Sequence, residues 1–311
     1  MGTTEPGGIT AEGVQRSFGT VQAVRGMDFT APPGSVTALI GPNGSGKTTL
    51  LLILASLLAP DAGTVRINGA DPLTQPQAVR RAVGWMPDTL GVWDSLTATE
   101  ILVTVGKLYG MAPAAAAARA AELLAEVRLS AFAEQPARVL SRGQQQRLSL
   151  ARALIHDPSV LLLDEPASGL DPGSRVELRL LLRRLAADGK TILVSSHVLS
   201  ELDEMADRAV FVSGGKTVKT QTLDEAGSQL RWYAIRAGRT GDLLRALDAH
   251  GLSHQAGDGP RRGQVRVQLA GEDQAAALLR DLVLGGVDVS AFAPATGALE
   301  ETYMSLEADK S

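Results

Sequence analysis

The sequence contains no cysteine among its 311 residues, and aromatic side chains make up only 4% of it. The absence of cysteine excludes a disulfide scaffold, a thiolate metal site and a cysteine nucleophile. An excess of one charge sign is also lacking, because 30 Lys and Arg residues stand against 34 Asp and Glu residues, giving a net charge of −4. This balance argues against a protein whose main partner is the phosphate backbone of a nucleic acid.

Long apolar runs are missing as well. The longest, Leu50–Ala59, is interrupted by Ser56 and ended by Pro60, whereas a membrane-spanning helix needs about 20 apolar residues. The N-terminal segment Met1–Ile9 has no basic stretch followed by an apolar run, so it does not resemble a secretion signal. We therefore expect a chain that does not cross a bilayer by itself.

What the sequence does contain is enough apolar surface, 44% of its residues, for a packed core. Three continuous apolar runs, Val36–Ile40, Val160–Leu163 and Thr191–Ser195, are typical of strands buried on both faces. Lys47–Leu58 has the spacing of a helix, and residues 209–220 predict a hairpin around Gly214-Gly215. Strands that alternate with helices predict an α/β core with a largely parallel sheet.

A mostly helical insertion is predicted at residues 96–154. Thr97 followed by Glu100 is a capping-box pattern, which predicts that a helix begins there. The alanine run Ala114–Ala121 continues into leucines at helical spacing and predicts a second helix.

After Thr220 the pattern changes to shorter strands and helices around a polar loop. We predict two domains, 1–221 and a small α+β domain at 222–311. The expected elements of the second domain are strands at Trp232–Arg236, Gln264–Leu269 and Val287–Phe292, helices at Asp242–His250 and Asp273–Leu284, and a loop at Gly257–Gly263.

The segment Gly41–Thr48 fits the pattern G-x-x-x-x-G-K-[ST] between a predicted strand and a predicted helix. Glycines let backbone N–H groups surround phosphate oxygens, and the helix N-terminus adds its dipole. Lys47 can neutralise the β- and γ-phosphates, and the Thr48 hydroxyl can bind Mg²⁺.

A second motif, Val160–Pro166, ends an apolar strand with Asp164 and Glu165. A carboxylate in this position can hold Mg²⁺, and the adjacent glutamate can polarise a water.

A third motif identifies a family. The segment Leu140–Gln144, followed by Gln146 and Arg147, resembles the LSGGQ signature of ABC ATPases. Ser168–Asp171 resembles the D-loop of that family, and His197 resembles its switch histidine. The resemblance covers about residues 9–220. It implies a P-loop NTPase core with an ABC-type helical insertion and an antiparallel β edge, followed here by the small α+β domain.

The resemblance also implies roles for individual residues. Glu165 is the general base and His197 contacts the γ-phosphate, while Ser141 and Gly143 cap the γ-phosphate bound to the opposite subunit. The residues expected to bind nucleotide are Phe18, which stacks on adenine, the loop residues Asn43, Gly44, Ser45, Gly46, Lys47, Thr48 and Thr49, and Ser141, Gly143, Gln144 and Asp171. The residues expected to bind Mg²⁺ are Thr48, Asp88 and Asp164.

Two positions depart from the family pattern. Asp88 stands where the family has glutamine, so a charged carboxylate replaces an amide that can donate. Arg142 replaces the first glycine of the signature. Both departures resemble those of exporter-type subfamilies, and we interpret them as tuning because Glu165 and His197 are intact.

The expected function is an ATP-binding and ATP-hydrolysing subunit of an ABC exporter. Residues 84–97 and the ending Leu299–Met304 resemble subunits that pair with type-2 export permeases. The expected partners are a second ATP-binding subunit, with a homodimer favoured, and a separately encoded membrane permease, which places the chain at the cytoplasmic face of the membrane. No nucleic-acid partner is expected.

The alternatives are a soluble ABC ATPase acting on ribosomes or DNA, an importer subunit with a regulatory C-terminal domain, and a non-hydrolysing regulator. The single cassette disfavours the first, the two departures mildly disfavour the second, and Glu165 conflicts with the third.

Overall fold

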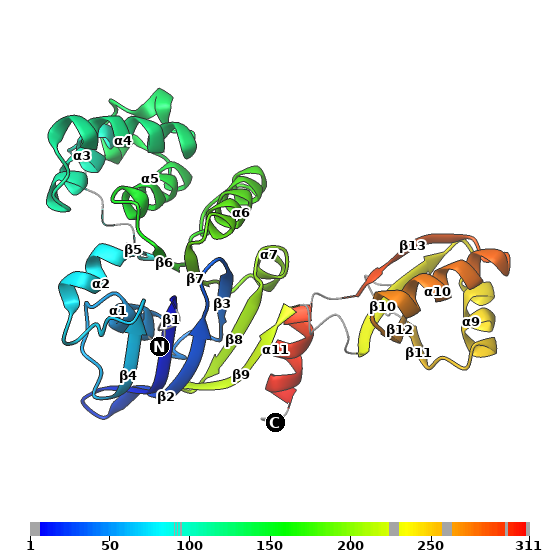
Figure 1. The fold of residues 1–311 in the computed structure, drawn as a ribbon. Helices are drawn as coiled ribbons and strands as arrows, with labels where there is room; N and C mark the ends of the chain where they lie inside the picture. The colour runs from blue at the N-terminus through cyan, green and yellow to red at the C-terminus, as the bar shows by residue number, and fades with distance from the viewer. Residues whose placement is uncertain are drawn as a thin grey trace, which may run out of the picture. The chain divides into compact units, whose positions relative to one another are not determined.

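The computed structural model describes residues 7–89, 91, 93, 95–223, 230–256, 263–295 and 298–308 (Figure 1). It divides into two compact units, Met1–Thr220 and Gln221–Ser311, and each is described by itself. In the described part of the chain, no helix combines the length and the apolar character that crossing a bilayer requires.

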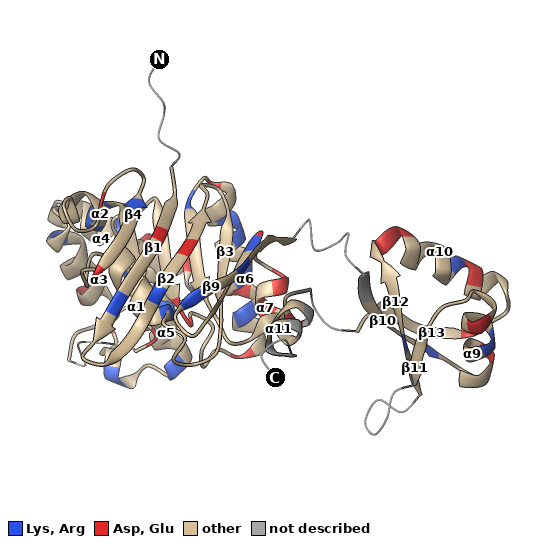
Figure 2. Cartoon of the chain, turned by 90° about the horizontal axis from the view of Figure 1, so that it is seen from below, with Lys and Arg blue, Asp and Glu red and all other residues tan. Residues whose placement is uncertain are grey.

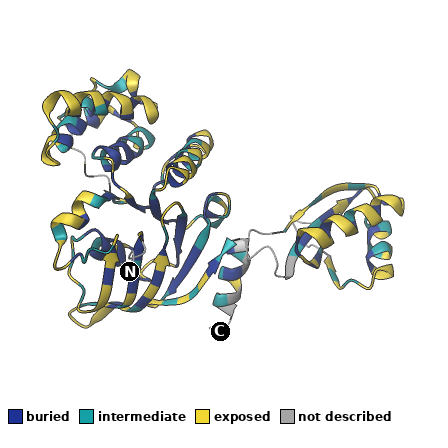
Figure 3. Cartoon of the chain, viewed as in Figure 1, coloured by how far each residue is buried: buried dark blue, intermediate teal, exposed yellow. Residues whose placement is uncertain are grey.

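The first unit is built on a six-stranded sheet of order β5-β6-β7-β3-β8-β9, in which the four pairings from β5 to β8 are parallel. Every residue of β3, β6 and β7 is buried, as expected for strands covered on both faces (Figure 3). The strands are β3 (Val36–Ile40), β5 (Val83–Met86), β6 (Val160–Asp164), β7 (Thr191–Ser195), β8 (Arg208–Ser213) and β9 (Lys216–Thr222).

An antiparallel sheet of order β2-β1-β4 forms the predicted β edge. Its strands are β1 (Ile9–Phe18), β2 (Val21–Ala31) and β4 (Ala62–Ile67). Helix α1 (Lys47–Leu54) packs between the two sheets, because its Leu50 shares one core cluster with Met27 of β2 and Leu162 of β6. The core that supports the phosphate loop is thus made by both sheets.

Helix α1 is four residues shorter than predicted. Ser56 adopts a left-handed conformation with φ +58°, and the N–H groups of Leu57 and Leu58 both donate to the carbonyl oxygen of Leu52. The apolar periodicity continues past Leu54, but this left-handed residue ends the helix.

The remaining helices of the core are α2 (Pro76–Ala82), α6 (Pro172–Ala187) and α7 (Leu199–Asp203). Helix α6 packs against β3 and β7. Acidic and basic side chains are interspersed over the elements of this unit (Figure 2).

The predicted helical insertion consists of α3 (Ala98–Leu108), α4 (Pro113–Glu126) and α5 (Arg142–Leu154), with short 3₁₀ turns η1 (Ser130–Phe132) and η2 (Ala137–Val139). The capping box at Thr97 and Glu100 is present in full. It satisfies backbone N–H groups that the first turn of α3 leaves without a partner.

The second unit has the order β10, α9, β11, β12, α10, β13, followed by α11, and its sheet order is β11-β12-β10-β13. Residues from α9 and α10 share one core cluster with alternate residues of β10 and β12, so both helices cover the same face of the sheet. The bounds are β10 (Leu230–Ala237), α9 (Thr240–Ala249), β11 (His254–Ala256), β12 (Gln264–Ala270), α10 (Gly271–Leu284), β13 (Val289–Pro294) and α11 (Ala298–Ala308).

The last strand of the sheet lies two residues later than predicted. The N–H group of Val287 donates to the carbonyl oxygen of Leu282, and Gly286 has φ +79°, so Val287 belongs to the C-terminal turn of α10. Residues 257–262 of the predicted loop lie outside the described residues.

Candidate active site

The loop between β3 and α1 has the geometry of a phosphate-binding loop. Gly46 adopts φ +94°, and a Cβ atom there would lie 2.3 Å from the carbonyl oxygen of Ala23, so only glycine fits. Lys47 Nζ donates to the carbonyl oxygens of Gly41 (2.7 Å) and Pro42 (3.1 Å). The loop therefore curls around an ammonium group at the N-terminus of α1, where N–H groups and the helix dipole attract an anion.

Two features of this loop fit a bound phosphate group. Ser45 is 2% exposed, and its Oγ has no hydrogen-bond partner, which is unfavourable for a buried hydroxyl. Burial lowers the pKa of Lys47, and the nearby carboxylates of Glu165 and Asp164 act in the opposite direction. Phosphate oxygens can accept from Ser45 and can supply further negative charge that keeps Lys47 protonated.

Asp164 is fixed by two hydroxyl groups at the end of β6. Thr48 Oγ1 donates to Asp164 Oδ2 at 2.8 Å, and Ser195 Oγ donates to Asp164 Oδ1. Asp164 is only 2% exposed. Because a carboxylate and a hydroxyl are both oxygen ligands of the kind that Mg²⁺ prefers, this pair fits a Mg²⁺ site beside the phosphate loop.

Glu165 follows in a left-handed conformation, with φ +52°. Such a conformation costs about 1–2 kcal/mol in a residue with a Cβ atom, so the surrounding structure must hold it. Its N–H group lies 3.2 Å from the carbonyl oxygen of Ser195 and 3.1 Å from Ser195 Oγ. The carboxylate extends to His197, whose Nδ1 lies 2.8 Å from Glu165 Oε2.

Lys47, Thr48, Asp164 and Glu165 line one pocket of about 390 Å³. Ser195 and His197 contact this group but, like Ser45, are not part of the lining. Its lining includes Val21, Gln22 and Ala23 of β2, which the sequence did not indicate. The lining residues that the sequence predicted are Asn43, Gly44, Gly46, Lys47, Thr48, Thr49, Asp88, Asp164 and Glu165. Asp88, the departure from the family pattern, thus shares the pocket with the phosphate loop and both strand-end carboxylates.

Ser195 is a site residue to which the sequence analysis gave no role. It pairs with Asp164 in the register of β6 and β7, and its hydroxyl and carbonyl contact both Asp164 and Glu165. A signal was present, because neighbouring parallel strands end at the same sheet edge and a serine ends the strand after the one that carries the acids.

The signature residues form the N-terminal cap of α5. Ser141 Oγ accepts from the N–H group of Gln144 (3.3 Å), and Gln144 Oε1 accepts from the N–H group of Ser141 (2.8 Å). The lining of the phosphate pocket does not include Ser141, Gly143 or Gln144. Within one chain, the signature is therefore not part of the pocket that contains the phosphate loop.

The substitution at Arg142 is accommodated by the D-loop. Arg142 Nη2 donates to Ser168 Oγ at 3.1 Å, and a Cβ atom on Gly169 would lie 2.9 Å from the Arg142 side chain. Gly169 itself has φ +75°. Arg142 thus links the signature to the D-loop of the same chain.

Asp171 at the end of the D-loop caps α6. It accepts from the N–H group of Ser174 at 3.0 Å and from the Ser174 hydroxyl, and these hydrogen bonds lower the pKa of the Asp171 carboxyl. Asp171 also lies outside the lining of the phosphate pocket.

Phe18 lies at the end of β1 with 49% of its surface exposed. The guanidinium of Arg16 lies 5.0 Å from the centre of the Phe18 ring. An exposed ring of this kind is open to stacking, although the lining of the phosphate pocket does not include it.

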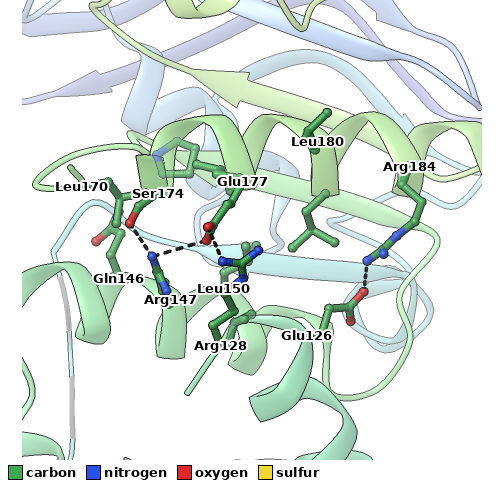
Figure 4. A pocket seen from close by; sticks show the side chains of 14 residues that line it. Glu126, Arg128, Gln146, Arg147, Leu150, Leu170, Ser174, Glu177, Leu180 and Arg184 are labelled. Carbon is green, nitrogen blue, oxygen red and sulfur yellow. Dashed lines mark hydrogen bonds and ion pairs between the residues drawn. The ribbon is translucent and has the colours of Figure 1, made fainter. Parts of the chain in front are cut away.

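A second cavity, of about 360 Å³, lies among α5, α6 and the end of α4 (Figure 4). Its charged groups pair with one another: Arg128 and Arg147 with Glu177, and Arg184 with Glu126. Since it contains neither the phosphate loop nor the strand-end carboxylates, we place the chemistry in the first pocket.

A family model described as ABC transporter matches residues 24–168. The chain is 32% identical to the daunorubicin resistance ATP-binding protein DrrA3 of Streptomyces coeruleorubidus over 306 residues, which cover 97% of this chain and 96% of that protein. It is 39% identical to the Nod factor export ATP-binding protein I of Paraburkholderia xenovorans over 211 residues, 68% of this chain and 69% of that protein.

Solved structures agree with these relatives. An ATP-binding subunit of an ABC transporter matches with a TM-score of 0.66 at 28% identity, covering 70% of this chain and 91% of that one. An ATP-binding cassette solved as a dimer in a post-hydrolysis state with ADP and Pi matches with a TM-score of 0.65 at 27% identity, covering 69% and 98%.

The fold and the site define an ATP-hydrolysing P-loop protein with a signature helix. The chain belongs to the ABC transporter family, among its ATP-binding subunits. The predicted fold class, ATP binding and ATP hydrolysis, and the predicted membership of the exporter group are confirmed by these relatives.

Proposed function

We propose that the chain hydrolyses Mg²⁺-bound ATP as one half of a dimer and drives a separately encoded permease of the type-2 export kind from the cytoplasmic face of the cell membrane. The observation that carries the proposal is the meeting of Lys47 and Thr48 with Asp164 and Glu165 in one pocket. Phosphate binding, metal binding and a general base are thereby within reach of one triphosphate.

Within this pocket each residue has a distinct task. Lys47 binds the β- and γ-phosphates, and Glu165 accepts a proton from the attacking water. Thr48 and Asp164 would hold Mg²⁺, which supplies positive charge beside the phosphate oxygens. His197, already in contact with the Glu165 carboxylate, orients that carboxylate and reaches the γ-phosphate.

The dimer is supported by the signature. Ser141 and Gly143 lie at the N-terminus of α5, which attracts an anion, yet they do not line the pocket of their own chain. A second subunit would bring its signature over the γ-phosphate of the first. The match to a cassette solved as a dimer agrees with this arrangement.

The permease is supported by the names of the relatives, which are ATP-binding proteins of a resistance and an export system. We expect the segment from Asp88 to Tyr109 to contact it. Trp93 is 48% exposed, and the neighbouring Gly91 carbonyl oxygen accepts from Arg152 Nη1 of α5 at 2.7 Å, so the insertion holds this loop. Leu96 is only partly exposed and accepts from the N–H group of Ala137, so Trp93 is the better contact.

Trp93→Glu is expected to separate ATPase activity from coupling. The isolated chain should keep its basal ATPase, because Trp93 lies outside the lining of the phosphate pocket. Affinity for the permease should fall at least about tenfold, since a buried tryptophan anchor is worth about 1.4 kcal/mol or more. The measurement is copurification with the permease together with transport in vesicles.

The matched control is Val218→Glu, which places the same charge on another exposed apolar residue, in β9. Full complex formation and transport by Trp93→Glu would remove this contact from the proposal.

A separate prediction concerns Asp88. Its carboxylate should repel a metal-free triphosphate, and Mg²⁺ should reverse this effect. Asp88→Ala and Asp88→Gln are therefore expected to bind ATP about tenfold more tightly than the wild type without Mg²⁺, a difference of about 1.4 kcal/mol. With Mg²⁺ the wild type should bind at least as tightly as either variant.

Calorimetric titrations with Mg²⁺ and with EDTA measure this dependence. Asp188→Ala, which removes an exposed carboxylate outside the pocket, is the control. Identical Mg²⁺ dependence and turnover in wild type and both Asp88 variants would show that Asp88 has no role at the phosphates.

A further inference from the structure

The backbone of Glu165 is held on both of its sides. Its left-handed φ of +52° is unfavourable for a residue with a Cβ atom. The following residue, Pro166, has no N–H group that could form a hydrogen bond and stabilise this conformation. On one side, the N–H group of Glu165 is bound by Ser195. On the other side, the carbonyl oxygen of Glu165 accepts from the N–H group of Ser168 at 3.0 Å and from Gln146 Nε2 at 3.0 Å.

The Gln146 donor comes from a different part of the fold. Gln146 is on α5, in the helical insertion, and it is 2% exposed. The other groups that hold Glu165 come from the end of β7 and from the D-loop. The side chain of Gln146 therefore connects the signature helix to the backbone of Glu165.

The position of Gln146 is itself fixed. The next residue, Arg147, donates to Ser174 Oγ and pairs with Glu177 of α6 at 3.5 Å (Figure 4). In the same view, Gln146 lies at the Leu170 and Ser174 end of the second cavity. A movement of α5 along or away from α6 would therefore displace the amide that holds Glu165.

We propose that Gln146 is a positioning residue for ATP hydrolysis: by donating to the carbonyl oxygen of Glu165 it keeps this residue in its left-handed conformation and its carboxylate directed at the attacking water. The position of the signature helix thereby sets the position of the general base. This inference rests on the proposed role of Glu165 as that base.

Gln146→Met tests the proposal because methionine has a similar length and no donor. The kcat for ATP is expected to fall about tenfold, equivalent to about 1.4 kcal/mol, because the carbonyl oxygen loses one of its two donors. The KM and the directly measured affinity for ATP should change less than about twofold, since no contact with the nucleotide is removed.

Gln145→Met is the matched control. Gln145 is the adjacent residue of the same helix, and its Nε2 donates to the carbonyl oxygen of Ala137 at 3.1 Å, within the insertion. The same substitution there removes one amide-to-carbonyl hydrogen bond from α5 without touching Glu165, so kcat should stay within about twofold of the wild type. Equal losses of kcat in the two variants would overturn the proposal.

Gln146→Glu makes the strength of the hydrogen bond to Glu165 depend on pH. A protonated carboxylic acid can donate to the Glu165 carbonyl oxygen, whereas an ionised one is repelled by it. The kcat of Gln146→Glu divided by that of the wild type should therefore rise as the pH falls. A ratio that is constant with pH would overturn the proposal.

The failure of this inference can be told apart from the failure of the base assignment. If Glu165→Gln hydrolyses ATP like the wild type, Glu165 is not the base and the inference falls with it. If Glu165→Gln is inactive and Gln146→Met has the kcat of the wild type, only the positioning role is wrong. Under the proposal, adding Gln146→Met to Glu165→Gln causes no further loss, because there is no base left to position.

Discussion

Glu165→Gln is expected to bind ATP with the affinity of the wild type and to lose nearly all turnover. An amide cannot accept the proton of the attacking water, and general bases contribute about 10²- to 10⁴-fold to a rate. The backbone contacts of Glu165 with Ser195, Ser168 and Gln146 do not involve its carboxylate, so the site should keep its shape. Because ATP then persists, the dimer should be trapped.

Phosphate release measures the turnover of this variant, and gel filtration with ATP measures its dimer. Glu201→Gln is the control, since it removes the same charge from a carboxylate that pairs with Arg175 at 2.7 Å outside the phosphate pocket. Glu201 is mostly buried, so its change should lower stability, but its carboxylate is not in the pocket and the folded control should hydrolyse ATP normally. Wild-type turnover in Glu165→Gln would exclude Glu165 as the base.

Lys47→Ala is expected to weaken the binding of ATP, the step that precedes hydrolysis. Lys47 lies at the N-terminus of α1 and is only 8% exposed, so its charge is weakly screened. Losing a charged hydrogen bond to phosphate costs about 1.5–3 kcal/mol, so ATP affinity should fall about 10- to 100-fold. Direct titration with a fluorescent nucleotide measures the loss.

Lys190→Ala separates this effect from general destabilisation. Lys190 Nζ donates to Asp157 at 2.6 Å and to the carbonyl oxygen of Pro158 at 2.7 Å, so it is another hydrogen-bonded lysine, but it lies outside the phosphate pocket. It should lower thermal stability modestly and leave ATP affinity unchanged. An equal loss of affinity in both variants would show that the charge of Lys47 is not specific to the phosphates.

The local features of the site could be predicted because neighbouring residues create them. The phosphate loop needs a glycine at position 46 and a cation at position 47. These two residues are adjacent in the sequence, so their relative positions do not depend on the rest of the fold. The capping boxes at Thr97 and Ser141 likewise use residues three positions apart, so the pattern alone indicates where α3 and α5 begin.

For the end of helix α1, the sequence pattern gave a wrong prediction. The apolar residues after Leu54 continue a helical pattern, but left-handed Ser56 ends α1, and its hydroxyl donates to the carbonyl oxygen of Pro72 at 3.0 Å. Here a contact with a residue distant in sequence accompanies the end of the helix, and periodicity contains no information about that contact.

The sequence by itself determined the family and the order of the motifs, and it predicted which residues bind phosphate, because each motif is a short segment whose chemistry depends on its own spacing. Only the tertiary structure decided how those segments act together. Ser195 reaches Asp164 across 31 residues, Arg142 reaches Ser168 across 26, and Gln146 reaches the Glu165 carbonyl across 19. These contacts depend on the register of the parallel strands and on the packing of α5 against the core, and long-range geometry of that kind leaves no period or spacing in the sequence.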